Sequence, residues 1–184
     1  MKEFKSLVVV PQPPERLWTA VRDRLQELVP LLDDIDAVTV ESRETKPDGT
    51  VHIVNSWRAR PPIPAALAAA LRPEMLSWTD RAEWRADGRE CHWRIEPHFY
   101  PERTRCRGVT LYEAAMAGRG TRVTFVGTLE VSAANLAGVP AFLEEITSRA
   151  IESFVTSMIP RNFQKLVRVA ADWLGGATGE AAPR

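Results

Sequence analysis

The stretch VPAFLEEITSRAIESFVTSMIPRNFQKLVRVAADWL, from Val139 to Leu174, decides the fold. Its apolar residues recur every four positions up to Met158 and resume after Pro160, which predicts a helix with one apolar face. They are Phe142, Ile146, Ala150, Phe154, Met158, Phe163, Leu166, Val167, Ala170, Trp173 and Leu174. Pro160 removes a backbone donor and predicts a kink. At about 1.5 Å per residue the helix would extend roughly 50 Å, so it needs a large apolar partner.

The residues before this helix predict that partner, a run of strands. Phe4–Val10 is rich in β-branched residues and ends at Pro11, as a strand would. Pro13-Pro14 favours the first turn of a helix, whose apolar stripe reaches Val29. From Ile35 the apolar period changes to two, and turn residues separate six further segments. These predicted strands cover residues 37–45, 50–59, 76–86, 89–98, 104–117 and 121–132.

The order of these elements predicts an α+β fold with an antiparallel sheet, because strands and helices do not alternate. The Asp-Gly turn after residue 86 predicts that Trp84 lies opposite Cys91. A tip at Arg119-Gly120 predicts that Tyr112 lies opposite Gly127. In these registers one face of the sheet is apolar and the other is charged, and the long helix would cover the apolar face.

Length and composition exclude several classes of protein. The 184 residues suit one domain, which we assign to residues 1–174, with a disordered tail at 175–184. Lys+Arg and Asp+Glu both count 24, so the chain lacks the excess of basic residues that is typical of nucleic-acid-binding proteins. Apolar runs are too short for a signal peptide or a membrane span, which favours a cytoplasmic protein without stable membrane insertion.

Metal and cofactor sites are not predicted. His52, His92 and His98 lack the spacing of a zinc site and fall on the outward face of the predicted sheet. No phosphate-binding glycine loop and no nucleophile elbow is present. Cys91 and Cys106 do not form a disulfide framework, and we expect two buried free thiols.

The chain resembles the helix-grip proteins of the START-like superfamily, also called SRPBCC proteins. The resemblance covers roughly Lys2 to Leu174. It is carried locally by the segments PPERLW (Pro13–Trp18), GVTLYE (Gly108–Glu113) and GTRVTFVGTLEV (Gly120–Val131). It implies a curved sheet of about seven strands around the C-terminal helix, with an apolar cavity between them. Relatives bind lipids, sterols, quinones or polyketides, and a minority are cyclases, aromatases or oxygenases. It therefore implies a small hydrophobic ligand and a monomer or homodimer.

The predicted inward face holds the candidate ligand site. Apolar walls with a few converging polar groups are typical of small-molecule sites. The predicted cavity residues are Asn55, Trp57, Trp78, Asp80, Trp93, Thr110, Tyr112, Phe125 and Phe154, and Ser42 shares their face. In a binding protein Asn55, Asp80 and Tyr112 would orient the ligand. In a polyketide cyclase or aromatase, Asp80 or Tyr112 would be the general acid or base. In a packed structural core, these groups would simply be satisfied by neighbours.

Two other segments have open interpretations. Ala65–Leu71 is an apolar stretch bounded by prolines, which predicts a short helix that is either a lid or a plain connection packed on the sheet. Arg103, Arg105 and Arg107 alternate along one strand. They would bind an acidic partner or, as we favour, form a solvated outer face in which Arg107 pairs with Glu96.

Overall fold

The computed structural model describes residues 1–60, 76–98, 101–132, 142 and 144–179. Within them one antiparallel seven-stranded sheet has the order β1-β7-β6-β5-β4-β3-β2. Its strands are β1 (Lys2–Val10), β2 (Ile35–Thr45), β3 (Val51–Ala59), β4 (Ser77–Arg85), β5 (Glu90–Pro97), β6 (Thr104–Ala115) and β7 (Gly120–Val131). The helices are α1 (Pro14–Asp23), α2 (Leu25–Leu28) and α3 (Glu144–Gly179), with 3-10 turns η1 (Val29–Leu31), η4 (Pro101–Arg103) and η5 (Met116–Gly118).

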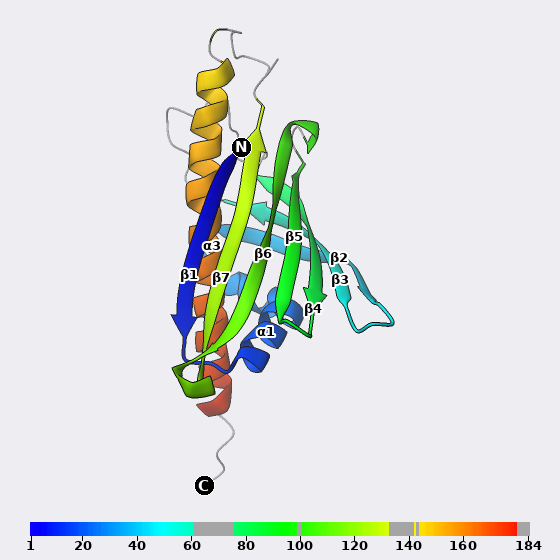
Figure 1. Ribbon diagram of the computed structural model, residues 1–184, viewed down its shortest axis with the longest axis vertical. Helices are drawn as coiled ribbons and strands as arrows, with labels where there is room; N and C mark the ends of the chain where they lie inside the picture. The colour runs from blue at the N-terminus through cyan, green and yellow to red at the C-terminus, as the bar shows by residue number, and fades with distance from the viewer. Residues whose placement is uncertain (61–75, 99–100, 133–141, 143, 180–184) are drawn as a thin grey trace.

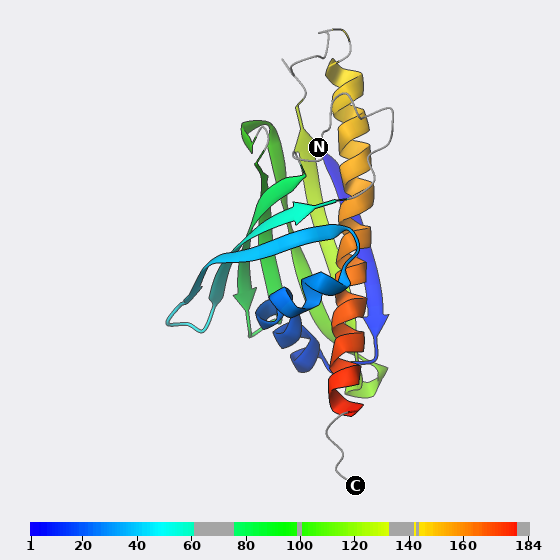
Figure 2. The same cartoon turned by 180° about the vertical axis from the view of Figure 1, so that it is seen from behind.

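The sheet curls around α3, as the sequence predicts. β1 and β7 run alongside the helix in Figure 1, and the view from behind in Figure 2 shows β2 curving back toward it. α1 and α2 lie beneath the curved sheet, beside the C-terminal half of α3. The arrangement is the helix-grip fold, in which the concave apolar face of the sheet is buried against one helix.

The C-terminal half of α3 is held by apolar packing and by side chains from distant segments. Val167 and Ala170 are fully buried in the core, against residues such as Leu17 of α1. Gln12 Nε2 donates a buried hydrogen bond of 3.0 Å to the carbonyl of Ala171. These contacts fix the helix against α1 and the sheet, so the space between helix and sheet has rigid walls.

The apolar residues at the start of the predicted helix do not form a buried face. Phe142 is 80% exposed and Ile146 is 66% exposed, whereas Ile151 is buried. A strict four-residue repeat advances by about 40° per step on a helix of 3.6 residues per turn, so it winds around the helix. Ile146 and Met158 of α3 therefore lie about 120° apart around the helix axis, and Phe142 lies before the helix begins. The helix runs continuously through Pro160 and ends at Gly179, beyond the predicted end at Leu174.

The last hairpin has a different register from the predicted one. Tyr112 pairs with Val123, and Gly127 pairs with Gly108. The tip is the turn η5 rather than Arg119-Gly120, because Met116 and Ala117 adopt positive φ values of 53° and 56°. The shift is even, so each side chain keeps its predicted face. The predicted pairing of Trp84 with Cys91 is confirmed.

Smaller predictions have mixed outcomes. Ser42 is exposed, because a bulge between Val40 and Ser42 disturbs β2. Glu96 accepts a 2.9 Å hydrogen bond from Arg81 and also binds Arg94, so the predicted pair with Arg107 is not formed. The predicted Ala65–Leu71 lid lies outside the described residues. None of the helices within the described ranges is long and apolar enough to span a membrane.

Candidate functional site

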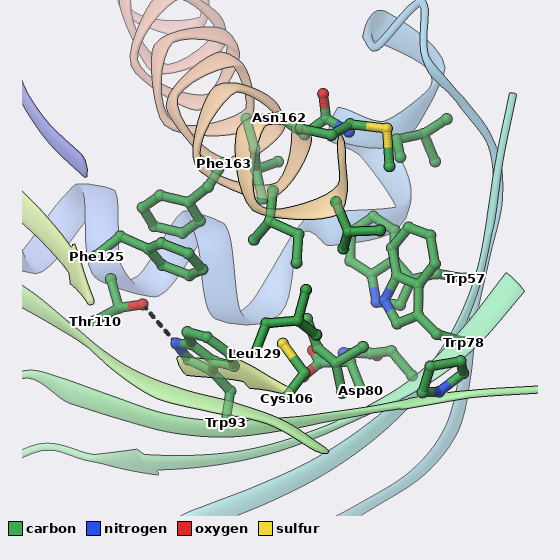
Figure 3. A pocket seen from close by; sticks show the side chains of 18 of the residues that line it. Trp57, Trp78, Asp80, Trp93, Cys106, Thr110, Phe125, Leu129, Asn162 and Phe163 are labelled. Atoms are coloured by element: carbon green, nitrogen blue, oxygen red, sulfur yellow. Dashed lines mark hydrogen bonds between the residues drawn. The ribbon is translucent and has the colours of Figure 1, made fainter. Parts of the chain in front are cut away.

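A cavity of about 290 Å³ lies between the inner face of the sheet and α3 (Figure 3). Its wall includes all of the predicted cavity residues except Phe154, which the helix turns away from it. α3 contributes other apolar side chains instead, and β5, β6 and β7 add further ones. These unpredicted lining residues include Ile151, Val155, Ile159, Phe163, Ile95 and Leu129.

An aromatic column crosses from the sheet to the helix and forms one wall of the cavity. Trp93 of β5 stacks on Phe125 of β7, with ring centroids 4.7 Å apart and planes 9° apart. Phe125 in turn stacks on Phe163 of α3 at 4.3 Å. The Trp93 indole N–H donates a 3.2 Å hydrogen bond to Thr110 Oγ1, drawn as a dashed line in Figure 3. This end of the cavity is therefore packed and its polar atoms are satisfied.

Two glycines that face each other across β6 and β7 make room for the column. A Cβ atom on Gly127 would lie 2.5 Å from Trp93 Cη2 and 2.6 Å from Phe4 Cζ. A Cβ atom on Gly108 would overlap the Val126 carbonyl oxygen and the Trp93 ring. The indole thus occupies space that side chains at these positions would fill, which explains glycine in a strand interior.

A second aromatic group stands across the cavity from the column. Trp57 of β3 and Trp78 of β4 are cross-strand partners and stack with planes 8° apart and centroids 5.9 Å apart. Figure 3 shows the pair on the opposite side of the cavity from Phe125 and Phe163. Both indoles are only half-buried, and both line the cavity. The site therefore has aromatic surface on two sides and aliphatic side chains between.

Asp80 is the carboxylate of the cavity wall. It lies on β4, directly opposite Asn55 of β3 and Ile95 of β5. Asp80 lines the cavity and is partly buried. Burial raises the pKa of Asp80 from its usual 3.8 to about 7, and interactions with Asn55 and Trp57 only partly oppose this. At neutral pH the group therefore exists in both protonation states.

Four polar groups of the inner wall lack hydrogen-bond partners among the described residues. Asn55 Oδ1 and Trp57 Nε1 lie beside Asp80, and Trp84 Nε1 and the hydroxyl of Tyr112 belong to two rings that pack on each other. The Trp57 N–H makes a polar contact with Asp80 that lowers the pKa of the carboxyl group. Buried polar atoms are nearly always paired, so unpaired ones beside a cavity indicate where a ligand or water would bind.

The predicted polar residues do not form one cluster. Asn55 and Asp80 are cross-strand neighbours, but Tyr112 lies on β6 at the level of Val123 and packs on Trp84, with centroids 6.2 Å apart. Tyr112 is 1% exposed, and burial raises the pKa of its phenol well above the usual 10.0. Tyr112 is therefore a neutral wall residue whose hydroxyl is covered, whereas Asp80 is accessible from the cavity.

The two cysteines are buried free thiols, as predicted. Both line the cavity. Burial raises the pKa of Cys106 to about 12 and that of Cys91 well above the usual 9.0. They are therefore uncharged at neutral pH and belong to the apolar wall.

Sequence reasoning missed several polar residues of the wall, among them Asn162, Arg22 and Arg103. Asn162 lies on α3 above the cavity and makes no hydrogen bond with the described residues (Figure 3). Arg22 is held by Asp23, with two hydrogen bonds of 2.7 Å, and lies over the Trp18 ring. Arg103 pairs with Glu102 at 3.5 Å. Asn162 follows Pro160 on a helix face that looked polar in sequence, so no pattern singled it out. The three histidines do not line the cavity.

The outer face of the sheet holds a shallow groove as well. Arg81, Arg94 and Arg107 lie side by side across β4, β5 and β6, and Glu3, Glu83 and His92 share the groove with them. Glu96 binds two of the three arginines. Because opposite charges alternate there, the groove has no strong single-sign field, and the inner cavity remains the candidate site.

Comparisons with known proteins find related structures but no family. No family model and no curated protein matches this chain. A protein from Thermus thermophilus matches with a TM-score of 0.66 and 20% identity, over 96% of this chain and 99% of that one. The Zhui aromatase/cyclase from a Streptomyces species matches with a TM-score of 0.66 and 14% identity, over 93% of both chains. Ara h 8.0201 matches with a TM-score of 0.54 and 13% identity, over 95% of this chain and 98% of that one. The chain thus shares its helix-grip fold with these proteins.

Proposed function

We propose that this helix-grip protein binds a small hydrophobic or aromatic molecule in the cavity between its sheet and α3. The observation that carries the proposal is a cavity of about 290 Å³ inside an otherwise packed core. Protein interiors rarely keep voids larger than a water molecule, because each void forfeits packing energy. A cavity near the size of known ligand sites, with apolar walls and few polar groups, favours a ligand over a structural core.

The neighbours support the same proposal at a coarser level. One is named as an aromatase/cyclase, and it matches nearly the full length of this chain. Affinity for an apolar ligand would come from buried surface, at about 25 cal/mol per Å². We expect lipids, quinones and polyketide-like molecules to be the classes to test.

Native mass spectrometry of the purified protein, followed by organic extraction, tests the proposal. We expect a stoichiometric apolar or aromatic molecule to co-purify, or the empty protein to bind N-phenyl-1-naphthylamine with enhanced fluorescence. A protein that carries no small molecule and does not bind the probe would overturn the proposal.

A cavity-filling variant locates the binding. Val155 of α3 lines the cavity, whereas Val126 of β7 is 36% exposed on the outer face. Val155→Trp would place an indole in the cavity, and we expect probe affinity to fall by at least about tenfold. Val126→Trp is the matched control and should leave probe affinity unchanged. Equal affinities in the two variants would place the probe elsewhere.

Asp80 favours a second candidate function, a cyclase or aromatase. A carboxyl group with a pKa of about 7 inside an apolar cavity suits general acid/base catalysis at neutral pH. In that case Asp80→Asn would abolish turnover of a poly-β-ketone substrate mimic and leave its affinity nearly unchanged. Turnover that survives this change would exclude Asp80 as the acid or base. The covered hydroxyl of Tyr112 makes that residue the weaker candidate.

Further parts of the proposal rest on the sequence. We propose a cytoplasmic protein that acts as a monomer or homodimer, without nucleic acid, metal or cofactor and without stable insertion into a membrane. Size-exclusion chromatography with light scattering measures the oligomeric state.

A further inference from the structure

Asp80 is the carboxylate of the described cavity wall, and two unpartnered polar groups lie beside it. Asn55 lies directly opposite it on β3, and its buried Oδ1 has no partner among the described residues. The indole N–H of Trp57, two residues along the same strand, is also unpartnered. Figure 3 shows Asp80 on the sheet side of the cavity, between the Trp57–Trp78 pair and the column of Phe125 and Phe163.

No free cation faces Asp80 from the described elements that line the cavity. Arg22 is engaged by Asp23 and Trp18, and Arg103 pairs with Glu102. The other titratable groups of the wall are Cys91, Cys106 and Tyr112, which burial keeps neutral. No histidine lines the cavity. A carboxylic acid in such surroundings keeps its proton to a higher pH than an exposed one, and the protonated acid donates a hydrogen bond.

We propose that Asp80 determines specificity in the cavity, and that the ligand is a flat, neutral aromatic ketone or quinone whose carbonyl oxygen accepts a hydrogen bond from the Asp80 acid. This inference rests on the proposed function and names the class of ligand. It selects among the lipid, quinone and polyketide-like classes above.

The walls and the volume of the cavity support a flat ligand. Aromatic rings stand on two sides of Asp80, and such surfaces pack best against planar molecules. The volume of about 290 Å³ leaves room for a molecule of one or two rings.

The same surroundings disfavour an ionised ligand at this position. A fatty-acid carboxylate beside Asp80 would be buried without a cation, and an unpaired buried charge is costly. A hydrocarbon without a carbonyl would leave the Asp80 proton unpartnered. Ketones and quinones avoid both costs, because they bring an acceptor and no charge.

Three naphthalene probes of similar size test the inference by quenching of tryptophan fluorescence. They are 2-acetylnaphthalene, which carries the carbonyl, 2-ethylnaphthalene, which lacks it, and 2-naphthoate, which is charged. At about pH 6 we expect the ketone to bind about tenfold more tightly than the ethyl compound. We expect 2-naphthoate to bind at least about a hundredfold more weakly than the ketone.

Measurements on variants and at a second pH test whether Asp80 causes the preference for the ketone over the ethyl compound. At about pH 8.5, where Asp80 ionises, the ratio of ketone to ethyl affinity should fall to about one. Asp80→Leu removes the donor and should give a ratio of about one at both pH values. Asp80→Asn replaces the acid O–H by an amide N–H donor that does not titrate, so the ratio should stay near tenfold at both pH values. Glu83→Gln, a carboxylate change on the outward face of the same strand, should behave as the wild type.

The outcomes separate this inference from the proposed function. Equal binding of the ketone and ethyl compounds, or a ratio unchanged in Asp80→Leu, overturns the role of Asp80 but leaves a ligand cavity in place. Binding of 2-naphthoate as tight as that of the ketone also overturns it. Failure of all three probes to bind an empty protein overturns the proposed function and this inference together. Far-ultraviolet circular dichroism confirms that each variant is folded.

Discussion

The two ends of the cavity wall differ in how their polar groups are satisfied. Around Trp93 the rings stack closely, the indole N–H is bonded to Thr110, and glycines make space for the ring. Around Asp80 the tryptophans are half-buried, and Asn55 Oδ1 has no partner among the described residues. The first end resembles a protein core, and the second resembles a ligand-binding site. We therefore expect the first end to contribute mainly to stability and the second to carry the proposed ligand binding.

The largest effect should come from the packed end. Trp93→Ala removes the centre of the column and leaves Thr110 Oγ1 without its donor. We expect the free energy of unfolding to fall by about 5 kcal/mol, at the top of the range for large-to-small core changes. Urea denaturation measures it. Trp78→Ala at the other end should cost only about 1.5 kcal/mol, because that side chain is half-buried. Equal costs would contradict the division between the two ends.

The next effect is the pH dependence of stability at the Asp80 end. The pKa of Asp80 is about 7 in the folded protein, above its usual 3.8, so the native state binds this proton more tightly. Its contribution to stability is therefore complete below pH 3.8 and is lost as pH rises toward 7. The loss is on the order of 4 kcal/mol. Asp80→Asn should remove it, so the variant gains stability relative to the wild type across this window.

Chemical denaturation of both proteins at several pH values measures this difference. Only the difference between them reports on Asp80, because other groups also titrate. A difference that stays constant from about pH 4 to pH 7, the window set by the two pKa values, would show that Asp80 is not buried as described.

The smallest effect concerns Tyr112, which is buried like the packed end but has an unpaired polar atom like the Asp80 end. Its hydroxyl is buried and has no partner among the described residues, so it is a cost to folding. Tyr112→Phe should raise the free energy of unfolding by about 1 kcal/mol and leave probe affinity unchanged. Thermal denaturation and probe titration measure the two quantities. A marked loss of affinity would instead show that the hydroxyl contacts the ligand.

Much of the fold was predictable because it depends on local patterns. The alternation of apolar and polar residues along the strands identified the inner face of the sheet correctly. The assignment also holds for the last hairpin, because its register error is an even number of residues and an even shift leaves each side chain on the same face. The register itself depended on Met116 and Ala117 adopting positive φ, which nothing in their side chains favours. The four-residue repeat from Phe142 suggested a single face, but helical geometry turns such a repeat around the axis.

The members of the candidate site were largely predictable, but their chemistry was not. The facing of β3 and β4 identified Asn55 and Asp80 as inward residues. The sequence did not show that Tyr112 would be covered while Asp80 stays accessible. That difference depends on packing between strands that are distant in the chain. Asn162 was missed because a single amide on a helix face carries no periodic signal.

The facing glycines of β6 and β7 also have a consequence for protein engineering. Trp93 lies partly in the space that their missing side chains leave, so two positions on the sheet determine how far its ring projects toward α3. A methyl group at Gly127 would press on the rings of Trp93 and Phe4. The shape of the cavity can therefore be changed from a position that does not line it, with every lining side chain kept.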